Sequence, residues 1–161
     1  MLIFLDTEFT DFIDCELIAI GMVSEDGKHE FYAERTDYDT STCSDFVREA
    51  VIPHLGKIPG AACSRSDLSQ RLWSWFASLP GQVQIATEST TDRDLLWDAL
   101  GEGLPDNLEP SVFDLRPWFE EVSFNTAVAR YHEEPGRPWH HALHDAKAHC
   151  AGWKVVPKVS A

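Results

Sequence analysis

The stretch MLIFLDTEFT, residues 1–10, decides the fold, because an apolar run in it ends at two carboxylates. Residues 1–5 are all apolar, which is typical of a buried strand. Alternate residues of a strand point to the same face, so Asp6 and Glu8 can converge on one point. A divalent cation between them would offset their repulsion. Two solvated acids at a strand end are the simpler interpretation of so short a motif.

The segments that follow predict a mixed β-sheet with helices around it. Residues 16–23 and 29–33 read as two further strands, and the turn sequence EDGK at 25–28 indicates an antiparallel connection. Apolar spacing and capping residues then predict helices and strands in alternation. We expect helices over 45–55, from Ser64 or Ser66 to Leu79, and over 92–100, 117–130 and 142–153, with strands over 82–87 and 111–115. This order is typical of an α/β layered fold, and we expect a single domain over residues 1–161.

Composition narrows the class of protein. Of 161 residues, 43% are hydrophobic and 25% are charged, as in an ordinary globular domain rather than a disordered chain. The apolar runs are too short to cross a bilayer, and the first residues do not resemble a secretory signal. We therefore expect a cytoplasmic location, in which the four scattered cysteines are reduced packing residues.

The charge balance limits the kind of nucleic acid that the chain could bind. The formal net charge is −14, from 27 acidic against 13 basic residues, whereas phosphate contacts favour basic surfaces. Bound divalent cations can nevertheless be the largest local charges in a phosphate site. The charge therefore favours a small or single-stranded end over a wrapped duplex.

Two further places in the sequence could supply chemistry. Asp92 stands at the start of a predicted helix, where the helix dipole alone would favour an acid. Asp145 lies near the start of the last helix, and His140 falls in the loop before it. An imidazole close to a metal-bound water can act as a general base, although a histidine-rich surface cap is the simpler interpretation. A structural zinc site is an alternative, with the candidate ligands His140, His144, His149 and Cys150.

Taken together, these places resemble the motifs of the DEDDh exonucleases, which have a ribonuclease-H-like fold. Residues 3–10 (IFLDTEFT) resemble the first motif of that family, and residues 85–96 resemble the second. Residues 140–146 (HHALHDA) resemble the third motif, HxAxxD. That register selects Asp92 over Asp94, and His140 over His141 and His144. The compact size and the segment 46–55 (FVREAVIPHL) look closest to a small bacterial or phage branch of 3′–5′ exoribonucleases.

The chain departs from the family pattern in two places. Glu88 and Thr91 stand in the second motif where many relatives have asparagine and an aromatic residue. Asp11 and Phe12 replace a glycine that usually follows the first motif. These departures concern substrate contacts more than the acidic residues.

The resemblance implies a metal-dependent 3′–5′ exonuclease that hydrolyses phosphodiester bonds with two Mg²⁺ or Mn²⁺ ions. In that scheme Asp6, Glu8 and Asp145 hold one ion. Asp6 bridges to the second ion, which Asp92 reaches directly or through water. His140 takes the proton from the attacking water.

The resemblance also implies a single-stranded 3′ end as the substrate, with RNA favoured over DNA. Phe9 and Thr10 would contact the terminal nucleotide, with core packing as the alternative for Phe9. A DNA exonuclease, or a non-catalytic nucleic-acid-binding module that kept the fold, are the alternatives. Relatives are often dimers, so a homodimer is a further expectation, to which Trp73 and Trp118 could contribute, although core packing is the simpler interpretation of both.

Overall fold

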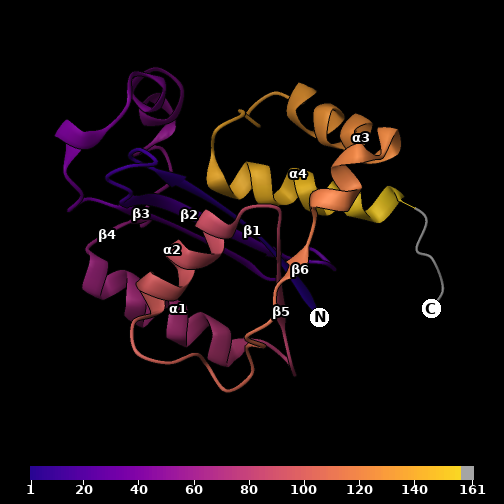
Figure 1. Ribbon diagram of the computed structural model, residues 1–161, viewed down its shortest axis with the longest axis horizontal. Coiled ribbons are helices and arrows are strands. Elements are labelled where there is room, and N and C mark those ends of the chain that lie inside the picture. Colours follow the sequence, from indigo (N-terminus) through magenta and orange to yellow (C-terminus); the bar gives the residue numbers. More distant parts are fainter. Residues whose placement is uncertain (157–161) are drawn as a thin grey trace.

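The computed structural model describes residues 1–156, which build one six-stranded sheet with helices on both faces (Figure 1). The strand order is β4-β3-β2-β1-β5-β6. β1 is antiparallel to β2 and parallel to β5, so the predicted mixed sheet is confirmed. The strands are β1 (Leu2–Phe9), β2 (Leu17–Ser24), β3 (Glu30–Arg35), β4 (Ala62–Cys63), β5 (Gln84–Thr87) and β6 (Phe113–Asp114).

Two pairs of helices cover the two faces of the sheet. Figure 1 shows α3 and α4 on one side and α1 and α2 on the other. The long helix α4 packs directly on β1 and β2, whereas α2 packs on β1 and β5. The α-helices are α1 (Arg65–Ser78), α2 (Thr90–Leu100), α3 (Val122–Glu133) and α4 (Ala142–Val155).

The alternation along β1 assigns each of its residues to one face. Ile3 and Leu5 belong to the larger core, under α1 and α2, and Phe4 belongs to the smaller core, which includes Ala146 and Cys150 of α4. Because side chains alternate, Asp6 and Glu8 lie on the Phe4 face, toward α4. β1 is thus covered on both sides, which explains why its sequence is apolar without interruption as far as Asp6.

Several predicted elements differ from those in the structure. The predicted helix over 45–55 is found as helical turns over 45–54, but mostly of other types than α: a π-helical turn, η2 (Val47–Val51), is followed by a 3₁₀ turn, η3 (Ile52–His54). Pro53 lacks the N–H that would continue an α-helix. The predicted helix over 117–130 is divided into the 3₁₀ turn η4 (Arg116–Glu120) and α3. A further 3₁₀ turn, η1 (Thr40–Thr42), lies in the loop between β3 and η2. The short strand β4 was not predicted, because two residues carry no detectable alternation.

Other expectations can be compared with the structure directly. All four cysteines are free, as expected. Within residues 1–156 no helix has the length and apolarity that a membrane crossing requires. Trp73 packs against the larger core and donates a hydrogen bond to the Leu100 carbonyl, and Trp118 packs beside Trp153, so both tryptophans serve the core. The homodimer and the single domain over 1–161 stay predictions, and residues 157–161 lie outside the described part.

The start of α4 touches the sheet at a glycine. A Cβ atom on Gly21 of β2 would overlap the backbone of Ala142 and Leu143. Only glycine therefore allows the first turn of α4 to lie directly against β2. Since Asp145 is in that turn and Asp6 pairs with Gly21 across the sheet, this contact sets how closely the two carboxylates approach.

Gly21→Ala should move α4 away from the sheet. We expect a loss of roughly 1–3 kcal/mol in the free energy of unfolding, as for overpacked sites, and weaker binding of divalent cations. Chemical denaturation and calorimetric titration with Mn²⁺ measure the two effects. Gly152→Ala is the matched control, because its Cβ would meet the Phe124 ring at 2.8 Å on the opposite side of α4. That variant should lose stability and keep its cation affinity; an equal loss of affinity in both variants would contradict the role of Gly21.

Candidate active site

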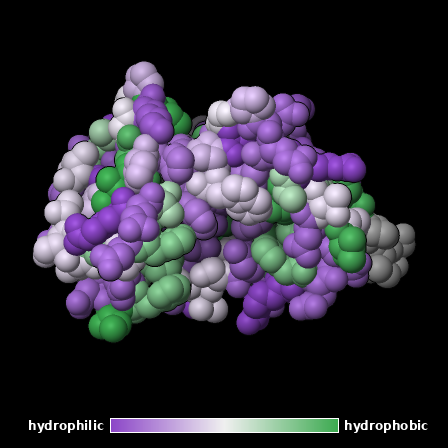
Figure 2. Space-filling model, turned by 90° about the horizontal axis from the view of Figure 1, so that it is seen from above, coloured by the Kyte–Doolittle hydropathy of each residue, from purple (hydrophilic) through white to green (hydrophobic). Residues whose placement is uncertain are grey.

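One cavity of about 360 Å³ lies where β1 ends, and several distant segments line it. The surface is hollowed between the segment that carries η2 and the pair α3 and α4, as the space-filling view from the α4 side shows (Figure 2). All seven residues predicted for the site line this cavity. They are Asp6, Glu8, Phe9, Thr10, Asp92, His140 and Asp145.

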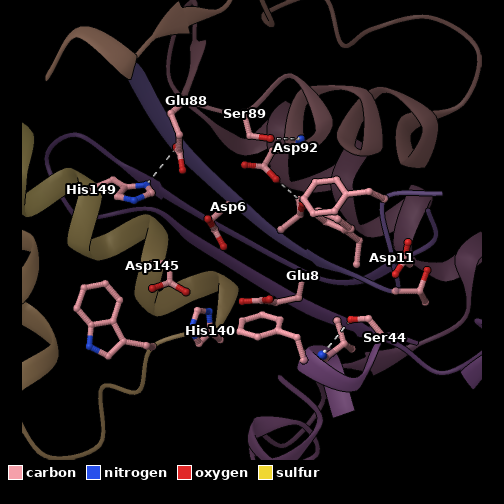
Figure 3. A pocket seen from close by; sticks show the side chains of 17 residues that line it. Asp6, Glu8, Asp11, Ser44, Glu88, Ser89, Asp92, His140, Asp145 and His149 are labelled. Atoms are coloured by element: carbon pink, nitrogen blue, oxygen red, sulfur yellow. Dashed lines mark hydrogen bonds and ion pairs between the residues drawn. The ribbon is translucent and has the colours of Figure 1, made fainter. Parts of the chain in front are cut away.

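Three carboxylates meet at the centre of the cavity. Oxygens of Asp6, Glu8 and Asp145 all lie within 4.8 Å of one another, close enough to ligate one ion (Figure 3). Asp6 and Glu8 come from β1, and Asp145 comes from the first turn of α4. The backbone N–H of His141 donates to Asp145 Oδ2 at 3.0 Å and holds the carboxylate in place. This arrangement matches the oxygen-rich ligand sets that Mg²⁺ and Mn²⁺ prefer.

Burial and nearby negative charges disfavour the ionised form of these carboxylates when no cation is bound. Burial is the main cause that raises the pKa of Glu8 to about 8, that of Asp92 to about 7 and that of Asp145 to about 6. Burial also raises the pKa of Asp6 well above its usual value, and its acidic neighbours raise it further. In order of effect those neighbours are Asp92, Asp145, Glu8 and Glu88.

The cavity offers no basic side chain to compensate this charge. Among the described residues that line it, none is a lysine or an arginine. A cation from solution is therefore the remaining source of positive charge beyond histidine. We conclude that the donor set fits a divalent metal ion.

Asp92 lies in the same cavity but is held by other bonds. The hydroxyl of Thr7 donates to Asp92 Oδ1 at 2.7 Å, and that of Thr87 donates to Oδ2 at 3.1 Å. Thr7 points to the opposite face of β1 from Asp6 and Glu8, toward α2. The helix begins at Thr90 and Ser89 caps it, so Asp92 lies in the first turn as the sequence predicted. Asp92 is outside the groups of acids and histidines within 4.8 Å of one another.

His140 stands at the rim of the cavity on strained backbone. Its φ is 58°, in the left-handed region, and it is the one non-glycine residue of the described chain with positive φ. The exposed ring contacts Phe46 edge-on, with centroids 4.8 Å apart. The neighbouring histidines point elsewhere: His141 stacks on Tyr32, and His144 Nδ1 shares a hydrogen bond with Tyr131. Of these three histidines, only His140 lines the cavity.

The alternative zinc site is not supported by the structure. His144 lies against Tyr131, and the Cys150 thiol points to the backbone oxygens of Ser24 and Glu25. Within residues 1–156, neither cluster that could hold a metal contains His140, His144 or Cys150. The i,i+4 spacing of His140 and His144 is compatible with zinc, but no second pair of ligands lies beside these two histidines among the described residues.

Aromatic side chains border the cavity. Phe9 packs edge-on against Phe12 with centroids 5.1 Å apart, and Phe12 is 82% exposed. Phe46 and Trp139 are also exposed and line the cavity. Thr10, in contrast, is fully buried, and its hydroxyl donates to the Asp14 carbonyl and accepts from the Glu16 N–H. The hydroxyl of Thr10 is therefore committed to its own loop, and contact of Thr10 with a substrate stays a prediction.

The sequence did not predict that three further side chains would lie at or behind the cluster: His149 was named only as a candidate zinc ligand, Glu88 only as a departure from the second motif, and His132 not at all. Glu88 follows β5, whose parallel neighbour is β1, so both strands end at the same edge. His149 lies one turn after Asp145 on α4, an i,i+4 spacing that was visible in the sequence. His132 Nε2 lies 3.1 Å from Asp145 Oδ1, and nothing in the local sequence of α3 indicated this contact.

The contact of His132 with Asp145 has a defined protonation requirement. His132 Nδ1 lies 3.0 Å from the Arg137 carbonyl, which can only accept, so Nδ1 carries a proton. The ring also stacks on Trp139, with centroids 3.9 Å apart. Nε2 faces Asp145 without a hydrogen bond, so the two groups form an ion pair only when His132 is protonated. Burial lowers the pKa of His132 and so disfavours that state.

The metal-free protein should lose stability as the pH rises from 5 to 9. The raised pKa values mean that the folded state holds protons that the unfolded state releases near pH 4. That stabilisation is complete below pH 4 and is lost as the pH passes about 6, 7 and 8 for Asp145, Asp92 and Glu8. Thermal unfolding in chelator measures this slope.

Asp6→Asn should flatten that slope, because the amide replaces a strongly perturbed acid of the cluster. The exposed Asp106→Asn is the matched control and should keep the slope of the unaltered protein. Mn²⁺ added at pH 8 should raise Tm in the unaltered protein and much less in Asp6→Asn. Identical slopes for all three proteins would show that the cluster does not carry this charge repulsion.

Comparison of the chain with known proteins gives one local and one global similarity. No family model matches the chain. Two proteins from different strains of Mycobacterium tuberculosis, each named 3′–5′ exoribonuclease, are 47% identical to it over 53 residues. That match covers 32% of this chain and 31% of each relative, so the chain spans about a third of the length of the curated relatives it matches.

The global similarity concerns the fold. The structure of S. pombe Pop2p in a form bound to Mg²⁺ and Mn²⁺ superposes with a TM-score of 0.65, at 15% sequence identity. The superposition covers 94% of this chain and 81% of that chain. It confirms the α/β, ribonuclease-H-like mixed sheet flanked by helices that the sequence predicted.

Proposed function

We propose that the protein is a metal-dependent 3′–5′ exonuclease that hydrolyses phosphodiester bonds at the 3′ end of single-stranded nucleic acid, with RNA favoured. The cluster of Asp6, Glu8 and Asp145, in a cavity that no described lysine or arginine lines, is the observation that carries the proposal. A phosphate would be repelled by this cavity unless cations were bound in it. The names of the partial relatives support the same direction and the choice of RNA.

The acidic residues would hold Mg²⁺ or Mn²⁺. Asp6, Glu8 and Asp145 would be the ligands of one ion, and Asp6, with Asp92 nearby, would contribute to the position of a second. Ions bound there would neutralise phosphate charge and make a bound water more acidic. The Thr7 and Thr87 hydroxyls keep Asp92 oriented toward the same cavity.

His140 is the general base in this proposal. It is exposed at the rim, and imidazole suits proton transfer near neutral pH. Its left-handed backbone and the edge contact with Phe46 define where the ring can lie. The ring can thus receive a proton from a water at the carboxylate cluster and release it to solvent.

The aromatic rim suits the terminal base of a single strand. Phe9, Phe46 and Trp139 border the cavity, and stacking of a base on an aromatic ring is worth roughly 1–3 kcal/mol without sequence preference. A single-stranded end can enter a cavity of this size, whereas a duplex would bring more phosphates to a chain with a net charge of −14. In this proposal the strand loses mononucleotides from that one end.

Asp145→Asn should abolish hydrolysis. The amide removes a ligand charge, and the loss should exceed about 10²-fold with Mn²⁺ present. The measurement is the stepwise shortening of a 5′-labelled single-stranded RNA from its 3′ end, with a DNA of the same sequence in parallel. Asp94→Asn, at an exposed helix position paired with Arg93, is the matched control and should cleave normally.

The same assay separates the alternatives. Cleavage of RNA before DNA, and its loss with chelator, is the expected pattern. Faster cleavage of DNA would select the DNA exonuclease. Binding of both strands without any cleavage in Mg²⁺ or Mn²⁺ would select the non-catalytic module and overturn the proposal.

His140→Ala should reduce the rate about 10²- to 10⁴-fold, the usual scale for loss of a general base. Mn²⁺ binding should persist, because the ring is not one of the clustered ligands. The comparison is with His144→Ala, which removes a histidine directed toward Tyr131 instead of the cavity. A normal rate in the His140 variant, measured by single turnover, would remove His140 from the mechanism.

A further inference from the structure

A second cluster of ligand atoms lies on the other side of Asp6. Atoms of Asp6, Glu88 and His149 lie within 4.8 Å of one another. Figure 3 shows Asp6 with Glu88 and His149 on one side of it and Glu8 and Asp145 on the other. Glu88 and His149 are directed toward each other. The three residues come from β1, from the turn after β5, and from the middle of α4.

The facing atoms of this cluster have no hydrogen-bond partner within residues 1–156. His149 Nδ1 and Glu88 Oε2 are both buried and unsatisfied, and only 9% of the His149 side chain is exposed. Buried polar atoms in native proteins are almost always bonded to protein, water or an ion. Two such atoms that face each other therefore point to a ligand between them.

The distance between these atoms suits a shared metal ion. His149 Nδ1 and Glu88 Oε2 are 3.7 Å apart, too far for a hydrogen bond. Two ligands that each bind one ion at about 2.1 Å can lie up to about 4.2 Å apart. The separation thus excludes a direct hydrogen bond and allows an ion held by both.

Packing holds the imidazole in this orientation. The ring of His149 lies edge-on to Phe119 at 5.3 Å and stacks with Phe124 at 6.3 Å between centroids. Neither aromatic ring is a strong hydrogen-bond partner for Nδ1. In the tautomer with its proton on Nε2, the lone pair of Nδ1 therefore faces Glu88.

We propose that Asp6, Glu88 and His149 form a second cation site, which shares Asp6 with the three-carboxylate cluster and prefers a transition-metal ion such as Mn²⁺ over Mg²⁺. A carboxylate has two oxygens, so Asp6 can contribute one to each site. Imidazole favours transition metals, whereas Mg²⁺ prefers oxygen ligands and keeps its waters. The inference rests on the proposed function for the role of the second ion, in which Glu88 and His149 act as ligands alongside the Thr-bound Asp92.

Calorimetric titration of the metal-free full chain with MnCl₂ and with MgCl₂ tests the site without any substrate. We expect two Mn²⁺ per chain. His149→Gln and Glu88→Gln should each weaken one Mn²⁺ site by about tenfold or more, with less than about threefold change for Mg²⁺. His144→Gln, which alters another α4 histidine outside the cavity, is the matched control and should bind two Mn²⁺.

A measurement on the unaltered protein does not depend on how the variants fold. In NMR spectra of the protein with ¹⁵N-labelled histidine rings, addition of Zn²⁺, a diamagnetic probe, should shift the resonance of His149 Nδ1. The resonance of His144 Nδ1 should not change. One Mn²⁺ per chain, or an unshifted His149 resonance at saturating Zn²⁺, overturns the second site. Cleavage of RNA by a protein with a single bound Mn²⁺ would contradict the second site and leave the exonuclease proposal standing. Two bound Mn²⁺ without cleavage would contradict the exonuclease proposal and leave the second site standing.

Discussion

Repulsion among carboxylates in a partly dehydrated cavity is the constraint on which the rest of this structure depends. Asp6, Glu8 and Asp145 converge within 4.8 Å, and Asp92 adds its charge nearby. Burial raises the pKa of Asp6 and of Glu8, and their acidic neighbours raise both pKa values further, so these carboxylates destabilise the fold as the pH rises. The arrangement becomes favourable when divalent cations occupy the space between the oxygens, which is why we interpret the cavity as a metal-dependent active site.

The fold contributes rigid supports on every side of the cluster. β1 is the strand on which both sheet faces depend, and it directs Asp6 and Glu8 to one face and Thr7 to the other. The contact of Gly21 with the start of α4 determines how near Asp145 comes. Such supports, built on a strand and a helix instead of on loops, hold ligand oxygens within the tolerances that metal catalysis requires.

The rim and the floor of the cavity differ in chemistry, because aromatic side chains form the rim and acidic side chains form the floor. The aromatic rim suits a base: Phe46 and Trp139 are exposed, and Phe9 is partly buried against the larger core, whereas the acidic floor suits ions. Glu88 and His149 extend the floor beyond the carboxylates and add a nitrogen ligand to it. The large negative charge of the chain acts against long polyanions, which agrees with the single-stranded end that we propose as the substrate.

The sequence by itself determined the mixed sheet, the strand that carries Asp6 and Glu8, and the helix starts that carry Asp92 and Asp145, because these features follow from periodicities of two and 3.6 residues and from local capping. Motif order also placed His140 before α4. Only the tertiary structure decided that Glu88 and His149 face each other, because their meeting depends on the parallel pairing of β5 with β1 and on the depth at which α4 packs. The apolar spacing over 45–55 indicated a helix but not that its turns would be of the π and 3₁₀ types, and the two-residue strand β4 is too short to leave a period in the local sequence.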